Sequence, residues 1–192
     1  QIVSLAQSMA TNLLSISGTT GTSTVSTIST EASSTLSQIA TVLNVSNGTG
    51  YAFAGQVSTE PPIKDPSSVA SGRTSTTVAD TLSQLTSGAS VDSILQQATT
   101  LMNEDSSIFS STISTASSTD GTASSTDGTA SSTDGTASLT TAQTQQTSTI
   151  TGDGTSSTYG VVATQGKTSD VKPTSTGSPI KDLMRDMMLI SG

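Results

Sequence analysis

Apolar residues near the start of the chain recur at mixed steps of three and four residues, in a sequence otherwise dominated by Ser and Thr. The first series comprises Ile2, Leu5, Met9, Leu13 and Ile16, and the second comprises Val25, Ile28, Ala32, Leu36, Ile39 and Leu43. Each series forms a narrow stripe on a helix, and this spacing is typical of helices packed lengthwise on one another. Gly18 and Gly21 separate the two series. The sequence therefore predicts an antiparallel helical hairpin.

The other end of the chain carries a third series with the same spacing. Ser178 is the expected N-cap, Pro179 occupies the first helical position, and Asp182 lies in the first turn. The apolar residues that follow are Ile180, Leu183, Met187 and Ile190. Helical segments at both ends predict that the termini pack together as a bundle.

The pattern changes between these ends. Tyr51 and Phe53 alternate with small residues after the Asn47-Gly48 pair, which predicts a turn followed by a short strand. Pro61-Pro62 and Pro66 indicate a loop. The other expected elements are a helix capped by Thr77 that runs to Gly88, a helix capped by Ser90 that runs to Met102, and strands near 147–150 and 158–164.

The expected fold class is α+β, with an α-helical bundle formed by both termini and a small mixed, loop-rich outer domain inserted between them. The predicted boundaries are 1–49 for the N-terminal helical hairpin, 50–177 for the outer domain and 178–192 for the C-terminal helix. Within the outer domain, SSTDGTA occurs three times over 117–137. The repeats contain no large apolar residue to offset their ordering entropy, so we expect an exposed loop. A calcium site there would need further oxygen ligands.

The residue types that are missing exclude several kinds of chemistry. Without Cys the chain has no disulfide framework or thiolate zinc site, and without His its 77 Ser and Thr residues form no Ser-His-Asp triad. The net charge of −8, with no cation between Arg73 and Lys167, argues against nucleic acid. No apolar run reaches the length of a membrane helix. We therefore expect no enzyme, and no catalytic, cofactor-binding or metal-binding residue.

Individual side chains have structural interpretations. Tyr51, Phe53 and Phe109 are expected to pack in the core. Two Lys-Asp pairs, which begin at Lys64 and Lys181, are interpreted as solvated surface charges. The acidic pair at 104–105 is expected to end a helix rather than to catalyse a reaction.

Two segments match the acceptor pattern for N-linked glycans, and they begin at Asn44 and Asn47. O-linked sugars on the exposed Ser and Thr loops are the more plausible modification. An intact mass at the unmodified value would exclude them.

Residues 47–55 read NGTGYAFAG, and residues 59–63 read TEPPI. This string resembles bacterial flagellins and the flagellar hook-associated protein 3. In that family a long helix ends in an Asn-Gly turn, and a Tyr-x-Phe-x-Gly strand and a Thr-x-Pro-Pro stretch follow. The predicted hairpin resembles the paired N-terminal core helices. The segment 153–168 is similar to a return strand pair in alphaproteobacterial members, and 178–190 to the start of the C-terminal core helix.

The resemblance implies a structural subunit of the bacterial flagellum, either filament flagellin or the hook–filament junction protein. Such a subunit self-assembles through helical core segments and serves motility. The implied location is extracellular, after export without a cleaved signal peptide. Implied partners are other copies, neighbouring junction proteins and a flagellar export chaperone, with no nucleic acid and no membrane insertion. The chain begins at Gln1 inside an apolar series. We therefore expect a fragment truncated at both termini that does not polymerise unaided.

An alternative from another class is a Ser/Thr-rich secreted or cell-surface binding module, such as part of an adhesin. This alternative predicts termini that are β-rich or disordered. A circular dichroism spectrum without helix would favour it.

Overall fold

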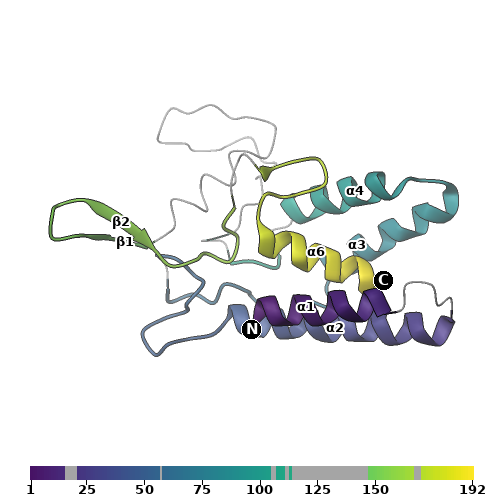
Figure 1. The fold of residues 1–192 in the computed structure, drawn as a ribbon, viewed down its shortest axis with the longest axis horizontal. Helices are drawn as coiled ribbons and strands as arrows, with labels where there is room; N and C mark the ends of the chain where they lie inside the picture. The colour runs from purple at the N-terminus through teal and green to yellow at the C-terminus, as the bar shows by residue number, and fades with distance from the viewer. Residues whose placement is uncertain (16–20, 57, 105–106, 111–112, 114–146, 167–169) are drawn as a thin grey trace.

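The computed structural model describes residues 1–15, 21–56, 58–104, 107–110, 113, 147–166 and 170–192 (Figure 1). Within these ranges the protein is mostly helical. The elements are α1 (Ile2–Ser15), α2 (Thr22–Leu43), α3 (Arg73–Asp80), the 3-10 helix η1 (Thr81–Ser87), α4 (Val91–Glu104), β1 (Thr147–Ile150), β2 (Ser156–Tyr159) and α6 (Pro179–Ser191). The predicted helical character is confirmed, and the three SSTDGTA repeats lie outside the described residues.

Helices α1 and α2 pack along one another (Figure 1). Most of the apolar stripe of α2 is buried. The buried residues of this hairpin are Met9, Ile28, Ala32, Leu36, Ile39, Ala40 and Leu43. Leu13 and Val25 belong to the predicted stripes but are 39% and 59% exposed. Leu13 lies near the end of α1 and Val25 near the start of α2, so both are at the end of the hairpin where the two helices are connected. The residues 16–20 that connect the helices lie outside the described residues.

Helix α6 lies between the hairpin and the middle of the chain, in contact with α2, α3 and α4 (Figure 1). Its end also meets α2 through a hydrogen bond from Ser29 Oγ to the carbonyl oxygen of Ser191, at 2.7 Å. The two ends of the chain are therefore in contact through α2 and α6.

The predicted stripe of α6 is wrong in detail. Ile180, Leu183 and Ile190 are only half-buried, whereas Met184 and Met188 are completely buried. The reason is that α6 contacts helices on more than one side, so its buried surface is wider than one stripe.

The start of α6 also differs from the expected capping. Ser178 is at the N-cap position and Pro179 follows it, as predicted, but Ser178 Oγ is buried and has no hydrogen-bond partner among the described residues. Asp182 instead accepts hydrogen bonds from the backbone N–H and Oγ1 of Thr176, both at 2.8 Å, and from Ser175 Oγ at 2.5 Å. The carboxylate of Asp182 thus holds the segment that leads into the helix.

The predicted strand at 51–56 does not form. The Asn47-Gly48 turn is present, with Gly48 at φ +88°, but only an isolated bridge joins Ser46 to Tyr51. The N–H of Tyr51 donates to the carbonyl of Ser58 at 2.8 Å. The chain therefore folds back on itself in tight turns over this segment instead of extending.

The two middle helices occur with different boundaries. The first begins at Arg73 rather than at Thr77, because the chain turns at Gly72, where a Cβ atom would lie 2.7 Å from the carbonyl oxygen of Ser68. It tightens into η1 and ends at Gly88, with φ +90°. The second is α4, and Ser90 Oγ accepts a hydrogen bond from the N–H of Ser93 at 3.2 Å, as expected of its cap.

Strands β1 and β2 pair in antiparallel register and project away from the helices (Figure 1). The second strand ends at Tyr159, earlier than predicted, because the chain turns at Gly160 with φ +84°. Beyond that turn Ala163 is buried, and its N–H donates to the carbonyl of Phe53 at 3.0 Å.

One cluster of buried apolar residues joins these parts. It includes residues of α1, α2, α3, α4 and α6, together with Ile63, Phe109 and Ile113 from the connecting segments. Phe53 packs against it while partly exposed, and Phe109 is buried, so these two aromatic side chains contribute to packing as predicted. Tyr51 is also expected in the core from the sequence, but it is only half-buried and is not among the residues of this cluster.

Candidate functional site

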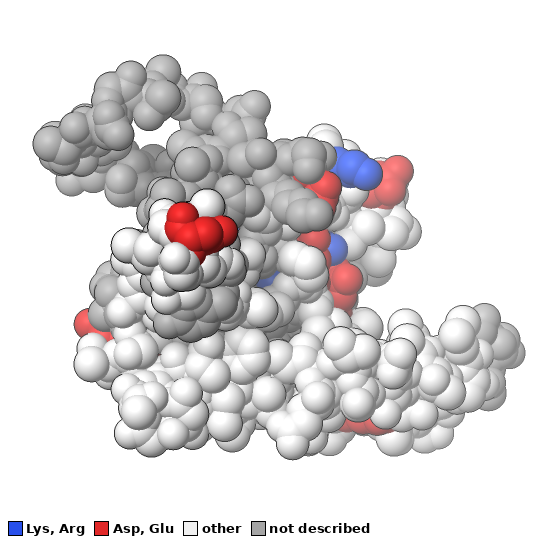
Figure 2. Space-filling view, turned by 60° about the vertical axis from the view of Figure 1, so that its left-hand side comes forward, with Lys and Arg blue, Asp and Glu red and all other residues white. Residues whose placement is uncertain are grey.

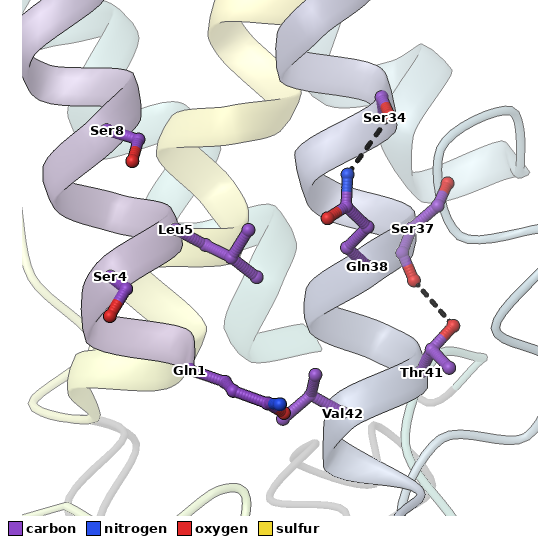
Figure 3. A pocket seen from close by; sticks show the side chains of 9 residues that line it. All are labelled: Gln1, Ser4, Leu5, Ser8, Ser34, Ser37, Gln38, Thr41 and Val42. Carbon is purple, nitrogen blue, oxygen red and sulfur yellow. Dashed lines mark hydrogen bonds between the residues drawn. The ribbon is translucent and has the colours of Figure 1, made fainter.

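A groove runs between α1 and α2 on the outer side of the hairpin (Figure 3). Its volume is about 620 Å³. Leu5 and Val42 supply apolar surface, and uncharged polar side chains supply the rest. The lining residues are Gln1, Ser4, Leu5, Ser8, Ser34, Ser37, Gln38, Thr41 and Val42. The groove is therefore suited to an uncharged partner surface rather than to an ion.

Several hydroxyl groups on α2 already donate to the helix backbone. Thr41 Oγ1 donates to the carbonyl of Ser37 at 2.9 Å, and Ser37 Oγ donates to the carbonyl of Ser33 at 3.1 Å. Farther along the helix Thr27 and Thr30 make the same bond to the residue four positions earlier, each at 2.9 Å. The protons of these hydroxyl groups are already used in hydrogen bonds within α2. The surface that a partner would meet therefore consists of oxygen lone pairs and, at the threonines, methyl groups.

The hairpin is almost free of charge. Glu31 is the only charged side chain in residues 1–43, and it accepts a hydrogen bond from Asn12 Nδ2 across the α1–α2 contact. In Figure 2 the hairpin is correspondingly nearly all white, and charged side chains gather on the other part of the molecule. A chain with a net charge of −8 thus presents one long face without electrostatic repulsion.

A buried polar network fastens α6 to the middle of the chain. The side chain of Arg185 is 5% exposed, and its Nη1 donates to Thr99 Oγ1 at 2.7 Å and to the carbonyl of Thr174 at 2.9 Å. Its Nη2 donates to Asp186 Oδ1 at 2.7 Å, and Asp182 lies 3.4 Å from Nη1. The guanidinium therefore joins α6 to α4 and to the segment before α6.

The interpretation of Lys181 as a solvated charge is wrong. Lys181 is 2% exposed, and its Nζ donates to Asn103 Oδ1 of α4 at 2.9 Å. It lies four positions before Arg185 on α6, so both cations face α4. Met184, directly before Arg185, and Met188, three residues after it, are also buried. Their spacing of four residues is the signal that could have revealed the buried face. Lys64 and Asp65 are exposed, as predicted.

Burial raises the pKa of Asp186 above its ordinary value of 3.8, although the hydrogen bond and the charge of Arg185 act in the opposite direction. A carboxyl whose pKa is raised by folding contributes stability below the unfolded value, and that contribution is lost as the pH rises through the folded value. Arg185 limits this loss at neutral pH.

The loop between the strands holds an ionised carboxylate. Asp153 is exposed and accepts hydrogen bonds from Thr151 Oγ1, from Thr155 Oγ1 at 2.7 Å and from the N–H of Thr155 at 3.1 Å. These bonds, first of all the one from Thr151, lower the pKa of Asp153 to about 2. The stability that this turn gains is present above pH 3.8 and is lost as the pH falls towards 2.

We expect a carboxyl titration of Asp153 followed by NMR to give a pKa of about 2, and the variant Thr151→Val to move the pKa back towards 3.8. A titration of Asp153 near 3.8 in the unaltered protein would show that the turn does not hold the carboxylate in solution.

The two predicted glycan acceptors have different surroundings. Asn44 is half-buried, and its side chain makes two hydrogen bonds of 2.8 Å with the backbone of Ile63, one to the carbonyl and one from the N–H. Its amide is thus engaged in the fold. Asn47 is exposed in the turn after α2.

The structure assembles no reactive cluster in its described part. Glu104 ends α4, and its neighbour Asp105 lies outside the described residues. Within the described ranges no group of three or more His, Cys, Asp or Glu side chains could hold a metal ion. No described helix combines the length and the apolar character that crossing a membrane requires. The groove and the α6 network are accordingly the two features with a possible role.

Comparisons with protein-family models, with curated proteins and with solved structures find no match for this chain.

Proposed function

We propose that the chain is a structural subunit of the bacterial flagellum, either filament flagellin or the hook–filament junction protein, and that it carries out no enzymatic reaction. In this proposal α1, α2 and α6 are the base of a helical bundle, and residues 50–177 form an outer domain. Other copies of the chain and neighbouring junction proteins are its partners, and a flagellar export chaperone binds it before export. Its location is extracellular.

The observation that carries the proposal is the contact between α2 and α6, which brings the two ends of the chain together. In a subunit whose two terminal segments both take part in assembly, the chain has to come back to the N-terminal helices after it has formed a domain that projects outward. The second support is the uncharged face of the hairpin, since copies of an acidic chain can approach one another there without repulsion. The resemblance of residues 47–63 to flagellar proteins adds a third.

The alternative of a Ser/Thr-rich adhesin or binding module predicts β-rich or disordered ends. Helices α1, α2 and α6 lie at the ends of the described chain, which favours the flagellar proposal over this alternative.

Gold-labelled antibodies raised against the chain distinguish these functions on intact cells. We expect label along the filaments if the chain is a flagellin, and label confined to the hook–filament junction if it is the junction protein. Label spread over the cell surface with bare flagella would overturn the proposal and support the adhesin. The amount of the chain in purified flagella distinguishes the two flagellar roles, because a filament subunit is the main protein of such a preparation and a junction protein is a minor one.

We expect Ser34→Glu in the native subunit to lower its incorporation into flagella by about tenfold, because the carboxylate would lose water in a groove whose lining holds no Lys or Arg to pair with it. Ser34 lines the α1–α2 groove and is exposed. The matched control is Ser83→Glu in η1, also exposed, which should leave incorporation unchanged. Equal incorporation of both variants would show that the groove is not a subunit contact.

A further inference from the structure

The turn after α2 presents an Asn-Gly pair whose side-chain oxygen accepts several hydrogen bonds. Asn47 Oδ1 accepts three hydrogen bonds, from Thr49 Oγ1 at 2.8 Å, from the N–H of Thr49 at 3.1 Å and from the N–H of Gly50 at 3.2 Å. Among the described residues, none accepts a hydrogen bond from Asn47 Nδ2. The amide is thus held at its oxygen and open to water at its nitrogen.

The neighbouring peptide nitrogen is equally accessible. Gly48 is exposed, and a Cβ atom at its position would meet nothing within 4 Å. Its N–H donates one long hydrogen bond, to Ser46 Oγ at 3.3 Å, and takes no part in a helix or a sheet. Asn47 and Thr49 also line a cavity of about 370 Å³ beside the segment 160–162, so water reaches the turn.

We propose that Asn47 is a self-modifying site, at which the turn promotes deamidation of its own asparagine. The three donors lie where negative charge develops on Oδ1 when a nucleophile attacks Cγ, in the manner of an oxyanion hole. The nucleophile is the backbone nitrogen of Gly48. This inference does not depend on the proposed function.

The reaction needs only water. A bond forms between Gly48 N and Asn47 Cγ, the bond between Cγ and Nδ2 breaks, and Nδ2 leaves as ammonia with the proton that Gly48 N loses. Water then adds to one of the two carbonyls of the resulting five-membered imide. Ring opening gives aspartate or isoaspartate at position 47, depending on which carbonyl is attacked.

The product changes the end of α2 in two ways. Either form adds one negative charge to a segment that is otherwise uncharged from Asn44 to Gln56. Isoaspartate also inserts a methylene into the backbone, which displaces the N–H of Asn47 from the carbonyl of Gly50, its partner at 3.1 Å. The fraction of molecules modified at this one surface position therefore increases with the time since synthesis.

The chain contains its own reference sites. Asn12, Asn44 and Asn103 precede Leu, Val and Glu, whose side chains hinder attack by the following nitrogen. In addition, Asn12 and Asn44 donate through their own amide nitrogens, to Glu31 and to Ile63. We expect these three residues to remain unmodified while Asn47 converts.

The experiment incubates the purified chain at neutral pH and 37 °C and follows each asparagine by peptide mass mapping. We expect conversion at Asn47 alone, at a rate about fivefold higher in the folded chain than in the same chain in urea. A folded rate equal to or below the rate in urea would overturn the proposal, because the hydrogen bonds would then restrain the amide instead of activating it. So would the absence of conversion at Asn47.

Two variants of one exposed residue test the donors directly. Thr49→Val removes the hydroxyl donor at constant shape, and we expect about fivefold slower conversion, the effect of one lost hydrogen bond. Thr49→Ser keeps the hydroxyl and should retain the native rate. If Thr49→Val converts as fast as the native chain or faster, the activating role of the turn is refuted.

Discussion

Replacement of Arg185 by methionine is expected to lower the free energy of unfolding by about 3 kcal/mol at neutral pH. The methionine can fill much of the space, but it leaves Asp186 without the donor at 2.7 Å and leaves Thr99 and the carbonyl of Thr174 without their partner. Asp186 is half-exposed and can still meet water, so much of the loss comes from Thr99 Oγ1, which stays buried after its donor is removed, and from the carbonyl of Thr174.

The measurement is urea unfolding followed by circular dichroism. Arg73→Met is the matched control, since Arg73 is exposed at the start of α3, and it should change stability by no more than about 0.5 kcal/mol. Equal losses in the two variants would mean that the network around Arg185 does not stabilise the fold in solution.

Acid should reduce the effect of the Arg185 substitution. Without the guanidinium, the pKa of Asp186 rises further above 3.8, because burial then acts with little opposition. Once the pH falls below that raised pKa, the carboxyl is neutral and no longer a half-buried charge without a partner. The difference in unfolding free energy between the native protein and the variant should therefore shrink on acidification. A constant difference would assign the loss to packing alone.

Leu36→Ala is expected to lower the free energy of unfolding by about 3 kcal/mol. Leu36 is completely buried in α2 and belongs to the cluster that joins the hairpin to α6, so truncation removes contacts and leaves a cavity. Leu14→Ala in α1 makes the same chemical change at a residue that is 75% exposed, and it should cost less than about 0.5 kcal/mol. A small loss at Leu36 would show that the cluster is loosely packed.

Local sequence signals were sufficient for the helices at both ends of the chain. An apolar series with helical spacing specifies which side of α2 is buried whatever the partner is, and Ile28, Leu36 and Leu43 are indeed buried. The buried face of α6 was missed in part because α3 and α4, which lie more than 70 residues earlier, cover the side that carries Lys181 and Arg185. The positions of Met184 and Met188 mark this side of α6 as buried, but no local signal identifies Asn103 as the partner of Lys181.

The segment around Tyr51 shows a different limit. Alternation of large and small residues is compatible with a strand, yet a strand also needs an extended partner. Here the nearest backbone groups are those of Val45 and Ser58, which accept hydrogen bonds from Ala52 and Tyr51 and bend the chain into turns. The three donors around Asn47 Oδ1 were likewise hidden, because an Asn-Gly pair specifies a turn but not the direction of its side-chain amide.

The hydroxyl groups that donate to their own helix on α2 have a consequence for any contact between like surfaces. Two surfaces that both offer lone pairs cannot bond directly, so water molecules must supply the missing protons between them. A contact of this kind would be hydrated along its length, and its strength would follow water activity more than ionic strength. Drying or concentrated osmolytes would then tune the adhesion of the hairpin, while salt would leave it almost unchanged.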